Sequence, residues 1–208
     1  MKIVELEKQE FIDFCNSNPQ ALFFQSPYWI EIKEQNGWSG KILGVKEDGK
    51  IVIATVILYK SLKGIIKFAY APRGFLMDYK NFDLLTEFTK EIKEYLKKEN
   101  VAFLKINPYV DYQLRDIHGN IIEGTKNDAL MEKLKSLGYK HYGFYVDMDE
   151  KKDLEPRWIS VLDIKGKTID ELFKTFRSGT KWGINNSKKN FITLIEADES
   201  NLVEFKNL

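Results

Sequence analysis

The sequence predicts a mixed α/β fold in which helices pack on a largely antiparallel sheet. Two observations predict it. Residues 41–71 contain three apolar runs separated by turns at Gly49 and Gly64, a pattern typical of an antiparallel meander. Residues 82–98 repeat apolar side chains at helical spacing, with lysines and glutamates between them, so an amphipathic helix follows the meander.

Short strands and helices alternate in the predicted first part of the chain. In order, we expect a strand at 2–6, a helix at 9–16, a strand at 21–24 and a helix from 27 to near 37. The second helix has the clearest start, because the Ser26 hydroxyl can cap it and Pro27 fits the first helical position.

The middle of the chain holds the meander and the strongest helix. We expect strands at 41–46, 51–59 and 65–71, the helix at 82–98, a strand at 101–106, a loop at 111–125 and a helix at 128–137. Gly138 stands where a left-handed residue commonly ends a helix. A loop of this length is often functional or mobile.

The strand–helix–strand pattern begins again after residue 156. In the last third we expect strands at 139–146, 157–164 and 191–195, and helices at 168–176, 178–189 and 199–206. Thr168 and Glu171 have the spacing of a capping box. The charged stretch 147–156 is expected to be a linker. We therefore expect a first domain at 1–153 and the beginning of a second at 154–208, truncated because so short a piece buries little surface.

Composition excludes several classes of protein. The 208 residues carry 32 lysines and arginines against 31 aspartates and glutamates, so the net charge of +1 gives no global sign of nucleic-acid binding. No apolar run is long enough for a membrane-spanning helix, and the N-terminus lacks a secretory stretch. A single cysteine excludes an internal disulfide, and two histidines disfavour a zinc site. We therefore expect a cytoplasmic protein without a metal.

Trp29 and Lys33 lie four residues apart on the helix expected from residue 27, with Gln25 just upstream. An aromatic ring and an ammonium at this spacing share one helix face and can hold a phosphate and a flat base or sugar. The competing interpretation is a surface lysine whose stem crosses a core tryptophan.

Two residues follow predicted strands directly. Arg73 lies between Pro72 and Gly74 at the end of an apolar strand, where it can bind an anion. A solvated turn arginine is the alternative. Asn107 ends the strand at 101–106, and an amide in this place can orient an amine or a carbonyl but cannot act as a base.

Residues 165–189 form the one strongly basic stretch. They hold seven lysines and arginines against two acidic residues, a local charge of +5, with Phe176 and Trp182 between them. Such a stretch can meet the phosphates of RNA or a nucleotide. The alternative is a solvated helix face.

The predicted meander flanked by helices suits an acyltransferase of the GNAT type. The phosphate-loop, dinucleotide-binding and nucleophile-elbow motifs are absent from the sequence. The glycine-rich loop that holds the pyrophosphate of coenzyme A in GNAT enzymes is absent too, since residues 177–183 contain glycines at the wrong spacing. A GNAT-like fold here would therefore use an acyl donor other than coenzyme A.

Four segments together carry a resemblance to a known family. Residues 24–33 (FQSPYWIEIK) are similar to its Gln…Trp…Lys helix, and residues 70–78 (YAPRGFLMD) to its Pro-Arg-Gly-Pro strand end. Residues 104–108 (LKINP) are similar to its Asp-Pro segment, and residues 180–189 (TKWGINNSKK) to its basic helix. The chain thereby resembles the Fem family of non-ribosomal peptidyltransferases, which build peptidoglycan cross-bridges.

The resemblance implies two GNAT-like domains and no resident cofactor. An aminoacyl-tRNA is the implied donor, and the implied acceptor is the stem-peptide amine of UDP-MurNAc-pentapeptide or lipid II. By the same resemblance, Lys33 contacts the diphosphate of the acceptor and Lys181 serves the same anion. A lipid acceptor would place the protein at the inner membrane face without a span.

The chain departs from the family pattern at three of these positions. Phe75 replaces a proline, Asn107 replaces the usual aspartate, and Lys181 replaces an arginine, so a point charge stands in place of a bidentate fork. No general base can be named. Two alternatives stay open: a coenzyme A-dependent GNAT N-acyltransferase, and a non-catalytic module of the same fold that binds a cell-wall precursor or RNA.

Overall fold

The computed structural model describes residues 1–62, 64, 66–144 and 158–207. The chain forms two compact units, Met1–Tyr142 and Gly143–Leu208. The predicted domain boundary at residues 153 and 154 and the predicted linker at 147–156 lie outside the described residues.

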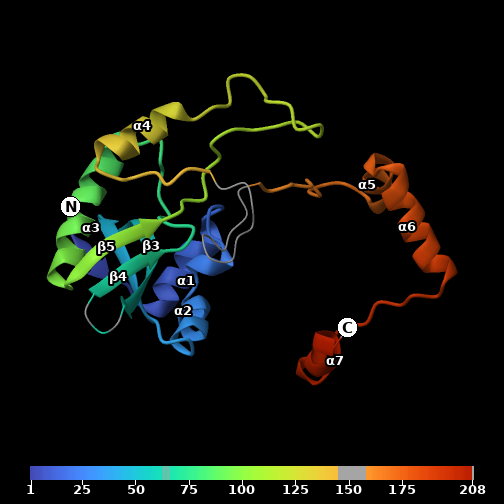
Figure 1. The fold of residues 1–208 in the computed structure, drawn as a ribbon, viewed down its shortest axis with the longest axis horizontal. Helices are drawn as coiled ribbons and strands as arrows, with labels where there is room; N and C mark the ends of the chain where they lie inside the picture. The colour runs from blue at the N-terminus through green and yellow to red at the C-terminus, as the bar shows by residue number, and fades with distance from the viewer. Residues whose placement is uncertain (63, 65, 145–157, 208) are drawn as a thin grey trace. The chain divides into compact units, whose positions relative to one another are not determined.

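A five-stranded sheet forms the centre of the first unit (Figure 1). Its strands are β1 (Ile3–Glu5), β2 (Ser39–Glu47), β3 (Lys50–Leu62), β4 (Ile66–Ala71) and β5 (Val101–Ile106), in this order across the sheet. β1 and β2, β2 and β3, and β3 and β4 are antiparallel pairs, and a short turn joins β2 to β3. β5 instead runs parallel to β4, since a helix lies between them in the chain. The sheet is thus mixed.

Helices cover both faces of this sheet. Those of the first unit are α1 (Lys8–Ser17), α2 (Pro27–Glu34), α3 (Phe82–Lys98) and α4 (Asp128–Ser136). On one face, Leu85 and Phe88 of α3 pack against Ile57 and Ala69 of the sheet. On the other, Phe11 of α1 and Ile30 of α2 lie in a cluster with side chains of β3. The predicted α/β class, a mixed sheet flanked by helices, is confirmed.

Local start and stop signals produced the expected boundaries. The Ser26 hydroxyl accepts a hydrogen bond of 3.3 Å from the backbone N–H of Trp29 and caps α2. Gly138, with a φ of 93°, follows α4 in the left-handed region. In the second unit, Thr168 and Glu171 form the predicted capping box at the start of α5 (Ile169–Thr175).

The strand predicted at residues 21–24 is wrong. Residues Phe23–Gln25 form a 3₁₀ turn instead. The rings of Phe23 and Phe24 lie edge-on to Trp29, with centroids 5.4 and 5.1 Å away. Apolar side chains here pack on a neighbouring helix residue rather than alternating across a sheet, which periodicity over four residues does not distinguish.

The described residues of the second unit form three α-helices and one 3₁₀ turn. They are α5, α6 (Ser178–Lys189), a 3₁₀ turn (Glu199–Asn201) and α7 (Leu202–Asn207). The strands predicted at 139–146, 157–164 and 191–195 are wrong for their described parts, 139–144, 158–164 and 191–195. A strand needs a neighbour for its backbone N–H and C=O groups, and none of the described residues pairs with them. Leu194 is accordingly 100% exposed.

Candidate functional site

The ends of the parallel strands β4 and β5 lie at the same edge of the sheet. The turn at residues 72–74 follows β4, and Asn107 follows β5. The Asn107 Oδ1 accepts a hydrogen bond of 2.9 Å from the backbone N–H of Arg73. Arg73 itself has a left-handed backbone, with a φ of 53°. The fold therefore joins two predicted site residues that are 34 positions apart.

The guanidinium of Arg73 lies near an aromatic ring. Its Cζ is 5.9 Å from the centroid of Tyr109, which follows Asn107 in the same loop. A guanidinium near a ring face keeps its charge and its planar fork of donors. Tyr109 was missed from the sequence, although an aromatic residue two positions after a strand-end asparagine was the available signal. The arrangement suits an anionic ligand.

The side chain of Gln25 supports the turn at residues 72–74 through hydrogen bonds. Its side chain is only 1% exposed. Oε1 accepts a hydrogen bond of 2.7 Å from the backbone N–H of Val56, and Nε2 donates to the carbonyl of Pro72. A buried amide that satisfies backbone groups on two segments fixes their relative position. The structure thus shows Gln25 as a residue that positions Arg73, and its predicted contact with a ligand stays a prediction.

Gly74 is required by the same packing. A Cβ at this position would lie 2.8 Å from Gln25 Nε2 and 2.8 Å from Thr55 Oγ1. On the far side of the turn, the buried Tyr79 hydroxyl accepts a hydrogen bond of 2.6 Å from the backbone N–H of Phe75. Burial raises the pKa of Tyr79, so this hydroxyl stays protonated. The turn that presents Arg73 is therefore anchored on both sides.

Trp29 and Lys33 form a local pair on α2. The Lys33 Nζ lies 4.6 Å from the centroid of the Trp29 ring, as their spacing predicts. Trp29 is partly buried against the apolar cluster that contains Phe11 of α1 and Ile30 of α2. Its Nε1 has no hydrogen-bond partner among the described residues. This packing holds the Trp29 ring in place, and the Lys33 ammonium lies over the ring.

Lys181 belongs to the second unit. It lies in the first turn of α6, where its Nζ donates a hydrogen bond of 2.8 Å to the carbonyl of Lys174, a residue of α5. The contact links the two helices. That Lys181 contacts the diphosphate of the acceptor stays a prediction.

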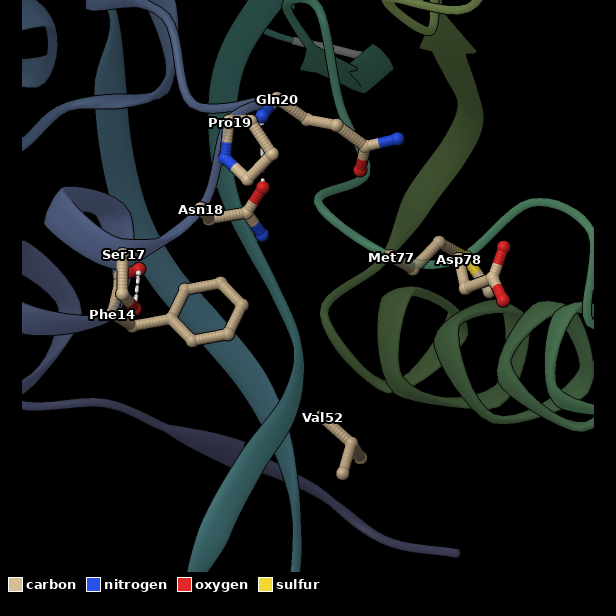
Figure 2. A pocket seen from close by; sticks show the side chains of 8 residues that line it. All are labelled: Phe14, Ser17, Asn18, Pro19, Gln20, Val52, Met77 and Asp78. Atoms are coloured by element: carbon tan, nitrogen blue, oxygen red, sulfur yellow. Dashed lines mark hydrogen bonds between the residues drawn. The ribbon is translucent and has the colours of Figure 1, made fainter.

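A hollow of about 390 Å³ lies elsewhere on the first unit. Figure 2 shows Asn18 and Gln20 on one side, Met77 and Asp78 on the other, and Val52 of β3 below them. Two amides and a carboxylate thus surround an apolar floor. None of the predicted site residues lines this hollow.

The described residues show no group of three or more histidine, cysteine or acidic side chains that could hold a metal ion. Burial raises the pKa of Cys15 to about 11, so its thiol is protonated at neutral pH and is a poor nucleophile. In the part of the chain that the structure describes, no helix is long and apolar enough to cross a bilayer. The candidate residues carry Lys, Arg, Trp, Tyr and amide side chains, and the structure brings together Gln25, Arg73, Asn107 and Tyr109 on one side and Trp29 and Lys33 on the other.

Comparison with known proteins decides the family. The FemAB family model matches residues 6–208. The chain belongs to the FemAB family. The resemblance seen in four short segments therefore extends along nearly the whole chain, and the fold and the family predicted from the sequence are both confirmed.

Individual relatives agree with this membership of the FemAB family. The aminoacyltransferase FemA of Staphylococcus aureus strain bovine RF122 is 32% identical over 208 residues, which are 100% of this chain and 49% of that protein. FemA of strain MRSA252 matches to the same extent. The crystal structure of FemX superposes with a TM-score of 0.78 at 27% identity, covering 100% of this chain and 48% of FemX. The chain spans about half the length of the relatives it matches.

Proposed function

We propose that this protein serves the transfer of an amino acid from an aminoacyl-tRNA to the stem-peptide amine of a peptidoglycan precursor. The observation that carries the proposal is the match to the FemAB family over residues 6–208, together with 32% identity along the full chain to proteins named aminoacyltransferase FemA. The proposed acceptor is UDP-MurNAc-pentapeptide or lipid II. The proposed location is the cytoplasm, and a lipid acceptor would bring the protein to the inner membrane face.

Two cations of the first unit support binding of an anionic acceptor. The Lys33 ammonium at the face of Trp29 is proposed to contact the diphosphate. Arg73, held by Gln25 and Asn107, presents a second cation at the sheet edge. Lys181 of the second unit is proposed to serve the same diphosphate. Charge-assisted hydrogen bonds of this kind are stronger than neutral ones.

The proposed reaction is aminolysis of an ester. The acceptor amine nitrogen bonds to the ester carbonyl carbon, the bond from that carbon to the terminal ribose oxygen breaks, and the ribose oxygen takes up the proton that the amine loses. The ester is already activated, so holding the two reactants together supplies much of the acceleration. Asn107 cannot act as the base, because its amide does not titrate and its Oδ1 already accepts from Arg73. No resident cofactor is proposed.

Calorimetric titration with UDP-MurNAc-pentapeptide tests the acceptor site. We expect wild-type protein to bind and Lys33→Ala to bind at least about tenfold more weakly, since a charge-assisted contact is lost. The control is Lys90→Ala. Lys90 is an exposed lysine on α3, the helix that covers the sheet face opposite α2, so this variant loses the same charge elsewhere and should bind like wild type. Equal affinity of Lys33→Ala and Lys90→Ala would exclude Lys33 from the site.

One observation favours a second function, a module that binds the precursor without transferring anything. Asn107 stands where the family pattern has a carboxylate, and its Oδ1 accepts a hydrogen bond from the backbone N–H of Arg73. Precursor binding without transfer from aminoacyl-tRNA would support this function. A rise in melting temperature with coenzyme A would instead favour a coenzyme A-dependent acyltransferase.

A further inference from the structure

The hollow of about 390 Å³ on the first unit is separate from the candidate site, because none of the predicted site residues lines it. It lies between the loop that follows α1 and the segment that follows the 72–74 turn, with β3 below them (Figure 2). Volumes of about 300–1,000 Å³ are typical of small-molecule sites. The hollow is therefore large enough to take a small organic ligand.

Three apolar side chains form what we call the floor of the hollow. They are Phe14 of α1, Val52 of β3 and Met77. Met77 is buried, whereas Phe14 and Val52 are half-buried and keep part of their surface open. An apolar group of a ligand would remove this surface from water, which is favourable.

Three polar residues form what we call the rim, and they are Asn18, Gln20 and Asp78. The Asn18 Oδ1 accepts a hydrogen bond of 2.9 Å from the backbone N–H of Gln20, and the Asp78 Oδ1 accepts one of 2.9 Å from the backbone N–H of Lys80. Within the described ranges these two side chains make no other hydrogen bond, and the Gln20 amide makes none. The rim therefore offers a donor at Asn18, an acceptor at Asp78 and both at Gln20.

Asp78 carries the only charge among the described residues that line the hollow. It forms no ion pair in the part of the chain that the structure describes, so its carboxylate is available to a ligand. The same lining holds no lysine, arginine or histidine that could pair with a carboxylate. A ligand with an ammonium group and a net positive charge complements this lining, because the contact with Asp78 is then charge-assisted.

Both walls of the hollow are fixed by backbone contacts. On the α1 side, the N–H of Asn18 donates to the carbonyl of Cys15 over 3.0 Å. On the other side, Leu76 exchanges hydrogen bonds of 2.9 and 3.2 Å with Ala54 of β3, directly before Met77. A site whose walls are already in place loses little conformational freedom when a ligand binds.

We propose that the hollow binds the amino-terminal residue of a peptide when that residue has an apolar side chain. The ammonium lies at Asp78, the first carbonyl oxygen accepts a hydrogen bond from the Asn18 Nδ2, and the apolar side chain lies on the floor. A peptide carbonyl is neutral, so it suits a lining that has no cation for a carboxylate. The inference goes beyond the proposed function, because it uses none of the residues assigned to the acceptor.

Titration of leucinamide into the nitrogen-labelled 208-residue chain, followed by proton–nitrogen correlation NMR, tests the proposal. Leucinamide combines an ammonium, a neutral carbonyl and an apolar side chain in one small molecule. We expect saturable shifts in the backbone signals of Asn18, Gln20 and Val52. N-acetylleucinamide lacks the ammonium and should bind about tenfold more weakly. Leucine, which has a free carboxylate, should also bind more weakly than leucinamide.

Asp78→Asn tests the contact with the ammonium. The variant keeps the oxygen that accepts from Lys80 but loses the charge, so we expect about tenfold weaker binding of leucinamide. The matched control is Asp83→Asn. Asp83 is an exposed residue in the first turn of α3 and does not line the hollow, so this variant should bind leucinamide like wild type.

Three results would overturn the proposal. One is equal affinity of Asp78→Asn and wild type for leucinamide, with matched melting temperatures to show that both are folded. Another is binding of N-acetylleucinamide as tight as that of leucinamide. The third is the absence of saturable shifts at the hollow with leucinamide at millimolar concentration. None of these results bears on the titration with UDP-MurNAc-pentapeptide, so failure of this inference and failure of the proposed function are distinguishable.

Discussion

The 72–74 turn and the Trp29–Lys33 pair both present a cation, but the chain builds them differently. The turn depends on contacts between distant segments, since Gln25 reaches Pro72 across 47 positions and Asn107 reaches Arg73 across 34. The Trp29–Lys33 pair needs only one helix and the spacing of four residues. Long-range contacts make a site rigid and couple it to stability, whereas a local pair can change without affecting the fold.

Gln25→Ala should break the turn and have the largest effect on stability. It removes a buried amide and leaves the N–H of Val56 without its partner, so we expect a loss of about 3 kcal/mol in the free energy of unfolding. Chemical denaturation measures it. Gln20→Ala, whose side chain lies at the hollow of Figure 2, is the control and should change stability by less than about 0.5 kcal/mol. Equal effects would refute the anchoring role of Gln25.

Gly74→Ala should strain the turn from within. Its Cβ would stand 2.8 Å from Gln25 Nε2 and from Thr55 Oγ1, so we expect a loss of about 2 kcal/mol on overpacking. Gly179→Ala on α6 is the matched substitution, because nothing lies within 4 Å of its Cβ. Thermal unfolding should show a lowered melting temperature for the Gly74 variant alone, and an unchanged one would contradict the close packing.

Asn107→Ala should weaken the contact between the 72–74 turn and the residue that follows β5. One partly buried hydrogen bond to the Arg73 N–H is lost, which costs about 1 kcal/mol. Asn107→Asp keeps an acceptor oxygen and should restore most of this stability. The comparison is made by denaturation at neutral pH, and an aspartate variant as unstable as the alanine variant would show that the amide group itself is needed.

Lys33→Ala should have the smallest effect on stability of these variants. Only a contact with the Trp29 ring is lost, so we expect a change of about 0.5 kcal/mol in the free energy of unfolding. The same variant should lose affinity for UDP-MurNAc-pentapeptide. Lys33→Arg, which keeps the charge, is the control for both measurements. A large loss of stability in Lys33→Ala would mean that the pair is structural.

Elements with local signals could be predicted well. The helix at Phe82–Lys98 follows from its apolar stripe, and the α2 start follows from Ser26 and Pro27. The prediction failed at residues 21–24, 139–144, 158–164 and 191–195, where apolar runs suggested strands. Periodicity records where apolar side chains lie, but a strand also requires a hydrogen-bonding neighbour.

The candidate site shows the same division. Trp29 and Lys33 could be paired from the sequence because helical spacing alone brings them together. Arg73 and Asn107 could be named as strand-end residues, but their hydrogen bond depends on β4 and β5 being parallel neighbours. The contacts among the rings of Trp38, Phe68 and Phe103 were not predicted, since these residues meet only through the pairing of the strands.

The sequence by itself determined the α/β class, most helix boundaries, the Trp29–Lys33 pair and the family, because these depend on spacing and on residue types that lie close along the chain. Tertiary structure alone decided that Gln25 is buried, that it supports the turn of Arg73, and that three aromatic rings share one sheet face. The physical reason is that burial and register are set by which distant segments pack together.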